Sequence, residues 1–548
     1  MNRREMLKLT GGAIATSFLA SNKIAIAQTN PLYQTNEPIN FSIDSAFTEL
    51  MQGIGSTPQD GGGKAIFTGS DPILRSHFRI GTSMALPAMA AGVGAAAIWK
   101  MRTGQEQDVR VDLREAVYNV NPLLTPIMQH RIASGRVPVG DIVPKSFTFT
   151  PTINDRLYQA PLGIGNPFSF VPFQTKDGRY VNITGAYPHL SDSALRLLGV
   201  SPERNKIAKA IQQWDANVLE DAMVEKKVIG VIHRSKEEWL KHPEGNFLAN
   251  VPLIDIRKIG DSDPIPFTSN PQQPLSGIKG LALTHVIAGS CASRTLAEYG
   301  ADILHVTRDQ SFEHEAIWTD VNVGMRSTLL DLKQSAQAAT LNALLPDADV
   351  FIESFSGRGI ERLGFGVEEV TKQRPGIIYL TVRCYSWDGP WQNRGGFDME
   401  ALAVSGYTMA EGGHGKPEIP PNFPGAIDEV GTKPLFPPTL VLNDYIAGYL
   451  GAAGVIAALR RRAVEGGSYH VSISLTRAAM WYQTLGRFPT TDFDATHPDH
   501  RMIPPETVRA NTAYGELYRL APLAKLSASP SHWRSPLLIV RGSDRPEW

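Results

Sequence analysis

The chain has 548 residues, which allows roughly three or four domains of about 150 residues each, and 42% of its residues are hydrophobic, so wholesale disorder is not expected. Its 53 basic and 54 acidic residues give a net charge of −1, which argues against a nucleic-acid-binding protein, because such proteins show a basic excess. The only two cysteines, Cys291 and Cys384, cannot form a disulfide framework or a CxxC zinc site, and we expect both to be small buried side chains.

The first 27 residues resemble an export signal. Arg3-Arg4 is a twin-arginine pattern, an apolar stretch too short to span a bilayer follows, and Ala25-Ile26-Ala27 has the small residues of a cleavage site. A mature chain would then begin at Gln28. A basic N-terminus that arose by chance is the alternative interpretation.

Two segments echo each other at an offset of 362 residues, as Ala91-Gly92-Val93 and Ala453-Gly454-Val455 show. Each copy predicts a small-residue helix, a Gly turn, an alternating strand and the start of another helix. The apolar run from Met84 to Trp99 is short for a membrane span, and its small residues favour a buried helix, so no integral membrane segment is expected. Such an echo indicates one supersecondary unit used twice. The counterpart of Asp444 is Thr82, so we expect the first copy to be a structural or regulatory relic.

Between the copies the pattern changes several times. A turn at 176–180 leads into a strand, residues 190–245 predict charged helices, and 258–276 have the composition of a linker. Strands then alternate with helices, which predicts a mostly parallel sheet with helices on its faces. The predicted strands lie at 278–283, 302–306, 348–353 and 376–382, and a helix is predicted at 289–299. The tail from 486 is Pro-rich and irregular, with a possible strand at 537–540.

Asp444 is a lone carboxylate at the head of the second Ala/Gly-rich helix, and no basic residue follows it before Arg460. Burying a charge costs on the order of several kcal/mol unless the charge is paired or used. Asp444 is therefore a candidate nucleophile or acid/base group. An ordinary helix cap is the alternative, because Asp before an apolar run is a common N-cap.

Most standard catalytic motifs are absent from the sequence. There is no GxxxxGK[ST] phosphate loop, no GxSxG elbow and no GxGxxG after a strand. His314-Glu315 begins like HExxH, but Trp318 stands where the second His is required. No metal site is therefore expected.

Several segments, taken in order, carry a resemblance. They are 283–289, 305–308, 329–333, 350–355, 359–364 and 395–398, with Asp444 last. In order and spacing they resemble the class III CoA-transferase family, which includes formyl-CoA and carnitine CoA-transferases and α-methylacyl-CoA racemase. The resemblance spans about 276–480. In ordinary members the linking domain lies downstream of the core, whereas here such a segment lies upstream, so the chain resembles a permuted or one-and-a-half-copy member.

The resemblance implies an α/β fold with a Rossmann-like core of mostly parallel sheet flanked by helices, a degenerate repeat of part of that core, and a linking domain. We therefore expect five parts: a twin-arginine signal-like segment at 1–27, a degenerate partial repeat at 28–170, a linking-domain-like segment at 171–275, the core at 276–485 and a C-terminal return segment at 486–548.

The resemblance also implies the chemistry. Asp444 matches the aspartate that attacks an acyl-CoA thioester, which gives a mixed anhydride and then an aspartyl-CoA thioester, in covalent catalysis by a carboxylate. Asp398 matches the second acidic position of the site. In the racemases a His precedes this acid, but here the residue is Phe397, which cannot move a proton, so a transferase is favoured over a racemase.

The resemblance also implies which residues bind coenzyme A. Arg308, Lys333 and Arg362 would hold phosphates, although each alone could be an ordinary surface charge. The loop from His285 would face the thioester with its backbone, and Ile287 stands where transferases often have Gln. The full set is His285, Val286, Ile287, Ala288, Arg308, Leu330, Lys333, Ser354, Phe355, Arg362 and Leu363.

The function implied is transfer of CoA from an acyl-CoA donor to a carboxylic acid acceptor, with acyl-CoA and a small acid as the partners. An acyl-CoA racemase or epimerase and a non-catalytic acyl-CoA or carboxylate-binding protein are the alternatives. The resemblance further implies a homodimer, with the active site between one chain's core and the other's linking domain, or completed by the degenerate copy within one chain. CoA chemistry predicts the cytoplasm, whereas use of the twin-arginine segment would place the protein in the periplasm.

Overall fold

The computed structural model describes residues 41–122, 152–154, 167–168, 171–309, 313–412, 434–489 and 493–548. The signal-like segment at 1–27 and the proposed start at Gln28 lie outside the described residues.

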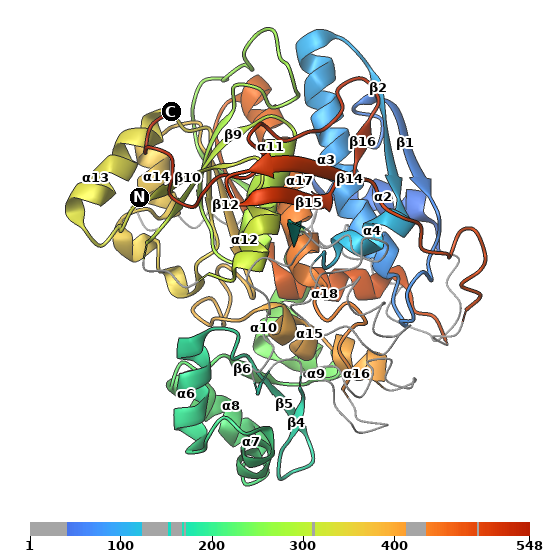
Figure 1. The fold of residues 1–548 in the computed structure, drawn as a ribbon, viewed down its shortest axis with the longest axis vertical. Helices are drawn as coiled ribbons and strands as arrows, with labels where there is room; N and C mark the ends of the chain where they lie inside the picture. The colour runs from blue at the N-terminus through green and yellow to red at the C-terminus, as the bar shows by residue number, and fades with distance from the viewer. Residues whose placement is uncertain are drawn as a thin grey trace, which may run out of the picture. The chain divides into compact units, whose positions relative to one another are not determined.

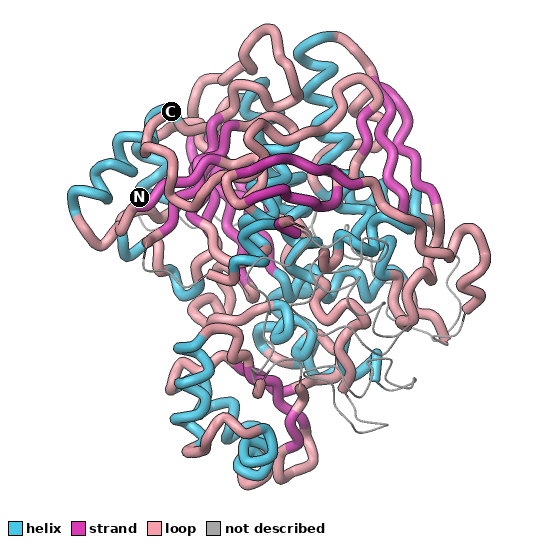
Figure 2. Tube along the Cα trace, in the orientation of Figure 1, coloured by secondary structure: helices cyan, strands magenta, loops and turns pink. Residues whose placement is uncertain are grey.

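A seven-stranded sheet in the order β10-β9-β8-β11-β12-β13-β7 forms the largest layer (Figures 1 and 2). Every neighbouring pair is parallel except β13 and β7, which are antiparallel. The mostly parallel α/β sheet predicted from the sequence is therefore confirmed. The strands are β7 (Asp255–Gly260), β8 (Lys279–Leu283), β9 (Asp302–Thr307), β10 (Arg326–Leu329), β11 (Val350–Glu353), β12 (Ile378–Arg383) and β13 (Ser468–Ser474).

Helices cover both faces of this sheet, which is why β12 is buried along its whole length. On one face Tyr379 joins a core formed with α13 and α14. Leu380 points to the opposite face, where a Cβ added to Gly451 of α17 would lie 3.2 Å from it. The helices are α11 (Ala288–Glu298), α12 (Glu315–Val321), α13 (Ser335–Leu344), α14 (Val367–Gln373), α15 (Asp398–Val404), α16 (Tyr407–Gly412), α17 (Asn443–Glu465) and α18 (Leu475–Tyr482).

Helices α11 and α17 pack closely because small residues line their contact. A Cβ added to Gly448 would lie 2.6 Å from the Cβ of Cys291, so this crossing requires glycine. Four short 3₁₀ helices complete the region: η1 (Leu345–Asp347), η2 (Ser356–Arg358), η3 (Glu361–Leu363) and η4 (Gln483–Leu485).

A smaller unit, which we call the upstream module, spans residues 171–232 and has a core of its own. Three antiparallel strands, β4 (Phe173–Gln174), β5 (Tyr180–Ile183) and β6 (Gly230–Ile232), pack with α6 (Pro188–Leu198), α7 (Arg204–Ile211) and α8 (Ala216–Glu225). The turn-plus-strand predicted at 176–183 is present here. Two further helices, α9 (Lys236–Lys241) and α10 (Pro243–Ala249), lead from the module to β7.

Near the start of the described chain, a long helix joins two parallel strands. α3 (Ile80–Thr103) connects β1 (Gly62–Thr68) to β2 (Gln107–Asp112), α2 (Ile43–Gly53) precedes β1, and α4 (Leu113–Asn119) follows β2. Helix α3 is long and apolar enough to cross a membrane, but its most apolar stretch is wholly buried within the protein.

The C-terminal tail is more regular than its sequence suggests. β14 (Thr507–Thr512) and β15 (Gly515–Leu520) form a hairpin that adds to β3 (Thr152–Ile153), and β16 (Lys525–Leu526) pairs with β2. Two sequence expectations are wrong. Residues 537–540 form no strand, and the linker predicted from 258 begins as the end of β7.

Candidate functional site

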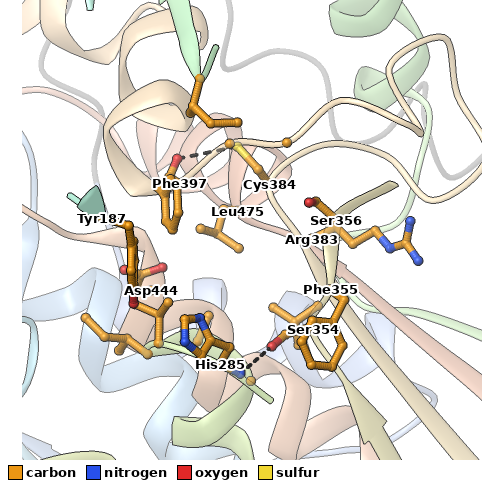
Figure 3. Close-up of a pocket in the computed structure, with 18 of the residues that line it drawn as sticks. Tyr187, His285, Ser354, Phe355, Ser356, Arg383, Cys384, Phe397, Asp444 and Leu475 are labelled. Atoms are coloured by element: carbon orange, nitrogen blue, oxygen red, sulfur yellow. Dashed lines mark hydrogen bonds between the residues drawn. The ribbon is translucent and has the colours of Figure 1, made fainter. Parts of the chain in front are cut away.

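A cavity of about 340 Å³ opens at the carboxyl ends of β8, β11, β12 and β13 (Figure 3). Ligand sites in open parallel sheets occur at this edge, because the loops that follow the strands converge there. Its walls are largely apolar, with a few polar side chains among them. The lining residues are Tyr187, His189, Leu190, Ile229, His285, Val286, Ile287, Ala288, Gly289, Ser354, Phe355, Ser356, Val382, Arg383, Cys384, Arg394, Gly395, Gly396, Phe397, Asp444 and Leu475.

Asp444 lies at the start of α17 and lines this cavity, with 9% of its surface exposed. The helix begins at Asn443, its N-cap residue is Leu442, and no side chain of the capping residue closes the helix. Asp444 is therefore not the helix cap that the alternative interpretation would make it. Its side chain is left for the cavity.

The cap is supplied instead by Asp398, from the start of α15. One oxygen of this carboxylate accepts the backbone N–H groups of Leu442 and Asp444, each at 3.0 Å, and also that of Asn443. Asp398 is buried and does not line the cavity, so it holds the helix start in place from behind. The structure thus gives this predicted site residue a positioning contact with the backbone of Asp444.

Burial sets the protonation of both acids. Burial, followed by the negative charge of Asp398, raises the pKa of Asp444 well above its usual range. Burial raises the pKa of Asp398 to about 7, although the three backbone N–H groups oppose this shift. Because the charge of Asp398 raises the pKa of Asp444, the protonation of one acid depends on that of the other.

Glu400, two residues further along α15, connects this acid pair to the upstream module. It accepts hydrogen bonds from Asn182 at 2.6 Å and Thr184 at 2.7 Å, and from the backbone N–H of Phe397 at 3.0 Å. Burial raises the pKa of Glu400 to about 7. These bonds fix the strand β5 against the helix that carries Asp398.

The loop between β8 and α11 forms the wall below Asp444 in Figure 3. The backbone N–H of His285 donates to Ser354 Oγ at 3.2 Å, and a Cβ added to Gly289 would lie 2.8 Å from the Ser354 side chain. Val286 has a φ of 64°, which is strained for a β-branched residue. Ala288 and Gly289 are the first residues of α11, so their N–H groups have no acceptor within the helix and can face a developing oxyanion.

Tyr187 of the upstream module stands beside Asp444 on the same wall (Figure 3). Its ring centroid lies 6.2 Å from that of Phe397 in a stacked arrangement, and 5.2 Å from His285. His285 in turn pairs with Glu313, with 2.9 Å between Nε2 and Oε1. Burial, the charge of Glu313 and then the charge of Asp444 raise the pKa of Tyr187, so its hydroxyl stays protonated.

Two arginines contribute to the cavity lining but are already engaged. Arg383, at the end of β12, pairs with the buried Glu353 at 3.1 Å, and Figure 3 shows its guanidinium turned away from Asp444. Arg394 donates to the carbonyl of Gly230 at 2.7 Å. Neither sits as a free cation beside the candidate nucleophile.

Cys384 also lines the cavity, and its thiol donates to the carbonyl of Phe397 at 3.4 Å. Burial raises its pKa well above the usual range, so this thiol is a poor nucleophile. Both cysteines are free and buried, as the sequence led us to expect.

A buried charge cluster supports α17 behind the site. The hydroxyl of Tyr445, the residue after Asp444, donates to Asp320 at 2.6 Å. Asp320 also pairs with Arg294 at 3.0 Å and with Arg519 of β15 at 3.1 Å. The C-terminal hairpin is thereby joined to the helix that carries the candidate nucleophile.

The predicted site residues fall into two groups. His285, Val286, Ile287, Ala288, Ser354, Phe355 and Asp444 line one cavity. The others are spread along the same sheet edge outside it. Arg308 and Lys333 are exposed after β9 and β10, and Arg362 donates to the carbonyl of Gly357 at 2.5 Å. Leu330 is buried in the core and Leu363 packs against it, and the contact of these two residues with CoA stays a prediction.

The sequence did not single out Tyr187, Arg383 or Arg394. Arg383 follows a predicted strand directly and could have been found from that position, whereas nothing local marks Tyr187. Among the described residues, no group of three or more His, Cys, Asp or Glu side chains could hold a metal ion.

Comparison with known proteins gives a consistent result. The model of CoA-transferase family III matches residues 275–519. An acetyl-coenzyme A transferase of Hypoxylon pulicicidum is 29% identical over 332 residues, which are 56% of this chain and 53% of that protein. The succinyl-CoA–L-malate CoA-transferase alpha subunit of Chloroflexus aurantiacus is 30% identical over 232 residues, which are 40% of this chain and 50% of that protein.

Among solved structures, the hypothetical protein Rv3272 of Mycobacterium tuberculosis is 27% identical and covers 39% of this chain and 57% of that chain, with a TM-score of 0.34. The chain spans about half the length of the curated relatives it matches. Residues 275–519, the segment that contains the core sheet and Asp444, are thus similar to CoA-transferase family III.

Proposed function

We propose that this protein transfers CoA from an acyl-CoA to a carboxylic acid through a covalent intermediate on Asp444. The observation that carries the proposal is the geometry of one helix start. Asp398 caps α17 from behind, which leaves the carboxylate of Asp444 on the wall of a cavity of about 340 Å³. A carboxylate held in a largely apolar cavity is poorly solvated, which makes it a better nucleophile than an exposed one.

The reaction is a series of balanced acyl transfers. An oxygen of Asp444 attacks the thioester carbonyl, CoA leaves as a thiolate, and an anhydride remains on the enzyme. The thiolate then attacks the Asp444 carbonyl, which releases the donor acid and leaves an aspartyl-CoA thioester. The acceptor carboxylate repeats the two steps in reverse, which regenerates Asp444. The N–H groups of Ala288 and Gly289 are suited to the oxyanions that form.

A second candidate is exchange of the α-proton of an acyl-CoA, as in a racemase. One observation favours it: His285 lines the same cavity as Asp444 and is held by Glu313 at 2.9 Å. An imidazole oriented by a carboxylate is suited to proton transfer. Deuterium incorporation at the α-carbon in heavy water, without an acceptor acid, would select this function over CoA transfer.

The test of the main proposal replaces the carboxylate of Asp444 by an amide of nearly the same shape. Asp444→Asn should lower CoA transfer by at least about 10³-fold with an unchanged melting temperature, because an amide cannot attack the thioester. Wild type incubated with acyl-CoA should give a hydroxylamine-sensitive CoA adduct on the peptide that contains Asp444. Asp388→Asn, a carboxylate outside the cavity, is the matched control and should form the adduct normally. Transfer retained by Asp444→Asn contradicts the proposal.

A further inference from the structure

Two parts of the fold correspond element by element at an offset of 362 residues. Helix α3 (Ile80–Thr103) corresponds to α17 (Asn443–Glu465), β2 (Gln107–Asp112) to β13 (Ser468–Ser474), and α4 (Leu113–Asn119) to α18 (Leu475–Tyr482). Each helix directly precedes the second strand of a parallel pair, β2 of β1–β2 and β13 of β12–β13. Each second strand also has an antiparallel neighbour, since β2 pairs with β16 and β13 pairs with β7.

The two long helices touch through equivalent residues. A Cβ added to Gly94 in α3 would lie 2.8 Å from Cγ2 of Ile456 in α17. Position 456 is the counterpart of position 94 at the same offset of 362. Equivalent residues come together beside a two-fold axis, so this contact is the one that a pseudo-two-fold relation between the helices would produce.

The helix starts correspond as well, down to their caps. Asp71 accepts the backbone N–H groups of Gly81 at 3.0 Å and Thr82 at 2.7 Å, just as Asp398 accepts those of Asn443 and Asp444. The hydroxyl of Thr82 also donates to Asp71, at 2.7 Å. We call the part with α3 the first unit and the part with α17 the second unit. The first unit therefore also has an acid that anchors its helix start, but it has a threonine, bonded to that acid, where the second unit has its candidate nucleophile.

The upstream module follows the first unit in the chain, but its side chains line the cavity of the second unit. Its Tyr187, His189, Leu190 and Ile229 line the cavity of Asp444. Hydrogen bonds to α15 of the second unit hold the edge of the module. Asn182 and Thr184 donate to Glu400, and just beyond the module the backbone N–H of Arg234 donates to the carbonyl of Ala403 at 3.0 Å.

We propose that the chain is a fused, asymmetric pair of units with a single reaction centre, completed within one polypeptide by the module that follows the first unit. This proposal rests on the proposed function of Asp444. The ring of Tyr187 stands beside the reacting carboxylate, between Phe397 and His285, and limits the space for the acyl group. A second copy of the chain is then unnecessary for activity.

The test mixes two defective chains. Asp444→Asn damages the core side of the centre, and Tyr187→Ala damages the module side, so the two are co-expressed with different tags. If the centre is built within one chain, the mixture shows no more activity than the two variants measured separately. If the module served another chain, about half of randomly formed dimers would be mixed and each would hold one intact centre, so about a quarter of wild-type activity would return and overturn the proposal.

The module variant needs its own control. Asp192 lies on α6 close to Leu190, is exposed and does not line the cavity. Asp192→Ala should therefore leave kcat/KM for every acyl-CoA unchanged. Tyr187→Ala should shift the preference among acyl chain lengths by roughly tenfold or more, since one methylene is worth about 10-fold or more in such pockets. An unchanged preference would remove Tyr187 from the site.

A binding measurement separates this proposal from the function of Asp444. Acetyl-CoA is titrated into wild-type protein by calorimetry, at concentrations where light scattering shows single chains. We expect one acetyl-CoA per chain and weaker binding by Tyr187→Ala, whether or not the protein turns over. Binding that appears only in dimers would overturn the single-chain centre, while loss of transfer chemistry alone would affect only the proposed function.

Discussion

The carboxylate of Asp398 accepts the backbone N–H of Asp444 at 3.0 Å, so one buried acid holds the residue that carries the other. The contact also places a negative charge near a carboxyl group that burial already makes hard to ionise. Position and protonation of the candidate nucleophile therefore depend on the same neighbour.

Asp398→Asn should change the pH dependence of transfer. Asp444 must be ionised to attack, so activity falls as the pH drops through its raised pKa. Removing the charge of Asp398 lowers that pKa, and the acidic limb of the kcat/KM profile should move to lower pH. Asp71→Asn is the matched control, because it alters an equivalent cap on α3 and should lower the melting temperature without moving the limb. An acidic limb that stays in place would show that Asp398 does not set the protonation of Asp444.

Glu298→Gln should flatten the pH dependence of stability. Burial raises the pKa of Glu298 to about 7 in the folded state, against 4.5 as its usual value. Between these values the folded state binds more protons than the unfolded state, so the free energy of unfolding decreases as the pH rises, by about 3 kcal/mol in total. Urea unfolding at about pH 5 and about pH 8 measures the difference. The exposed Glu369→Gln should keep the wild-type slope, and a Glu298→Gln protein with that same slope would contradict the prediction.

Val286→Gly should be more stable than Val286→Ala by about 1 kcal/mol. Both substitutions remove the valine methyl groups, but only glycine tolerates the φ of 64° without strain. Thermal unfolding of the two variants isolates the backbone cost, because the lost side-chain packing is nearly the same. Equal stabilities would mean that the loop at the cavity wall relaxes freely.

Gly94→Ala should destabilise the protein by roughly 1–3 kcal/mol, because its Cβ would lie 2.8 Å from Ile456 and the helices would have to separate. Adding Ile456→Ala should restore part of this loss, which a double-mutant cycle measures as a coupling energy. Gly53→Ala is the control, because no atom lies within 4 Å of the added Cβ. Additive effects of the two substitutions would argue against the helix contact.

Local pattern predicted much of the core fold. The continuous apolar runs of β8, β11 and β12 marked buried parallel strands, and the helix expected at 289–299 is α11 (Ala288–Glu298). The start of α17 lies one residue from Asp444. The edge strand β7 (Asp255–Gly260) escaped detection because three of its six residues are charged and its two isoleucines do not follow the alternating pattern of a strand.

The missing part of the site depends on long-range contacts. Asp398 reaches the backbone of Asp444 across 46 residues, and no local pattern records which N–H groups an acid will cap. Tyr187 comes from a separate unit with its own core, and its place beside Asp444 follows from the docking of that unit on α15. Its place in the chain and the family resemblance could name Asp444 as the candidate nucleophile, but could not name the groups that hold and enclose it.

A complex of two identical chains is encoded by one gene, so any codon change alters both of its halves together. In this chain separate codons encode the starts of α3 and α17, so a substitution at position 82 does not change position 444. Selection can therefore act on one half for scaffolding and on the other for chemistry, a division of labour closed to a symmetric homodimer.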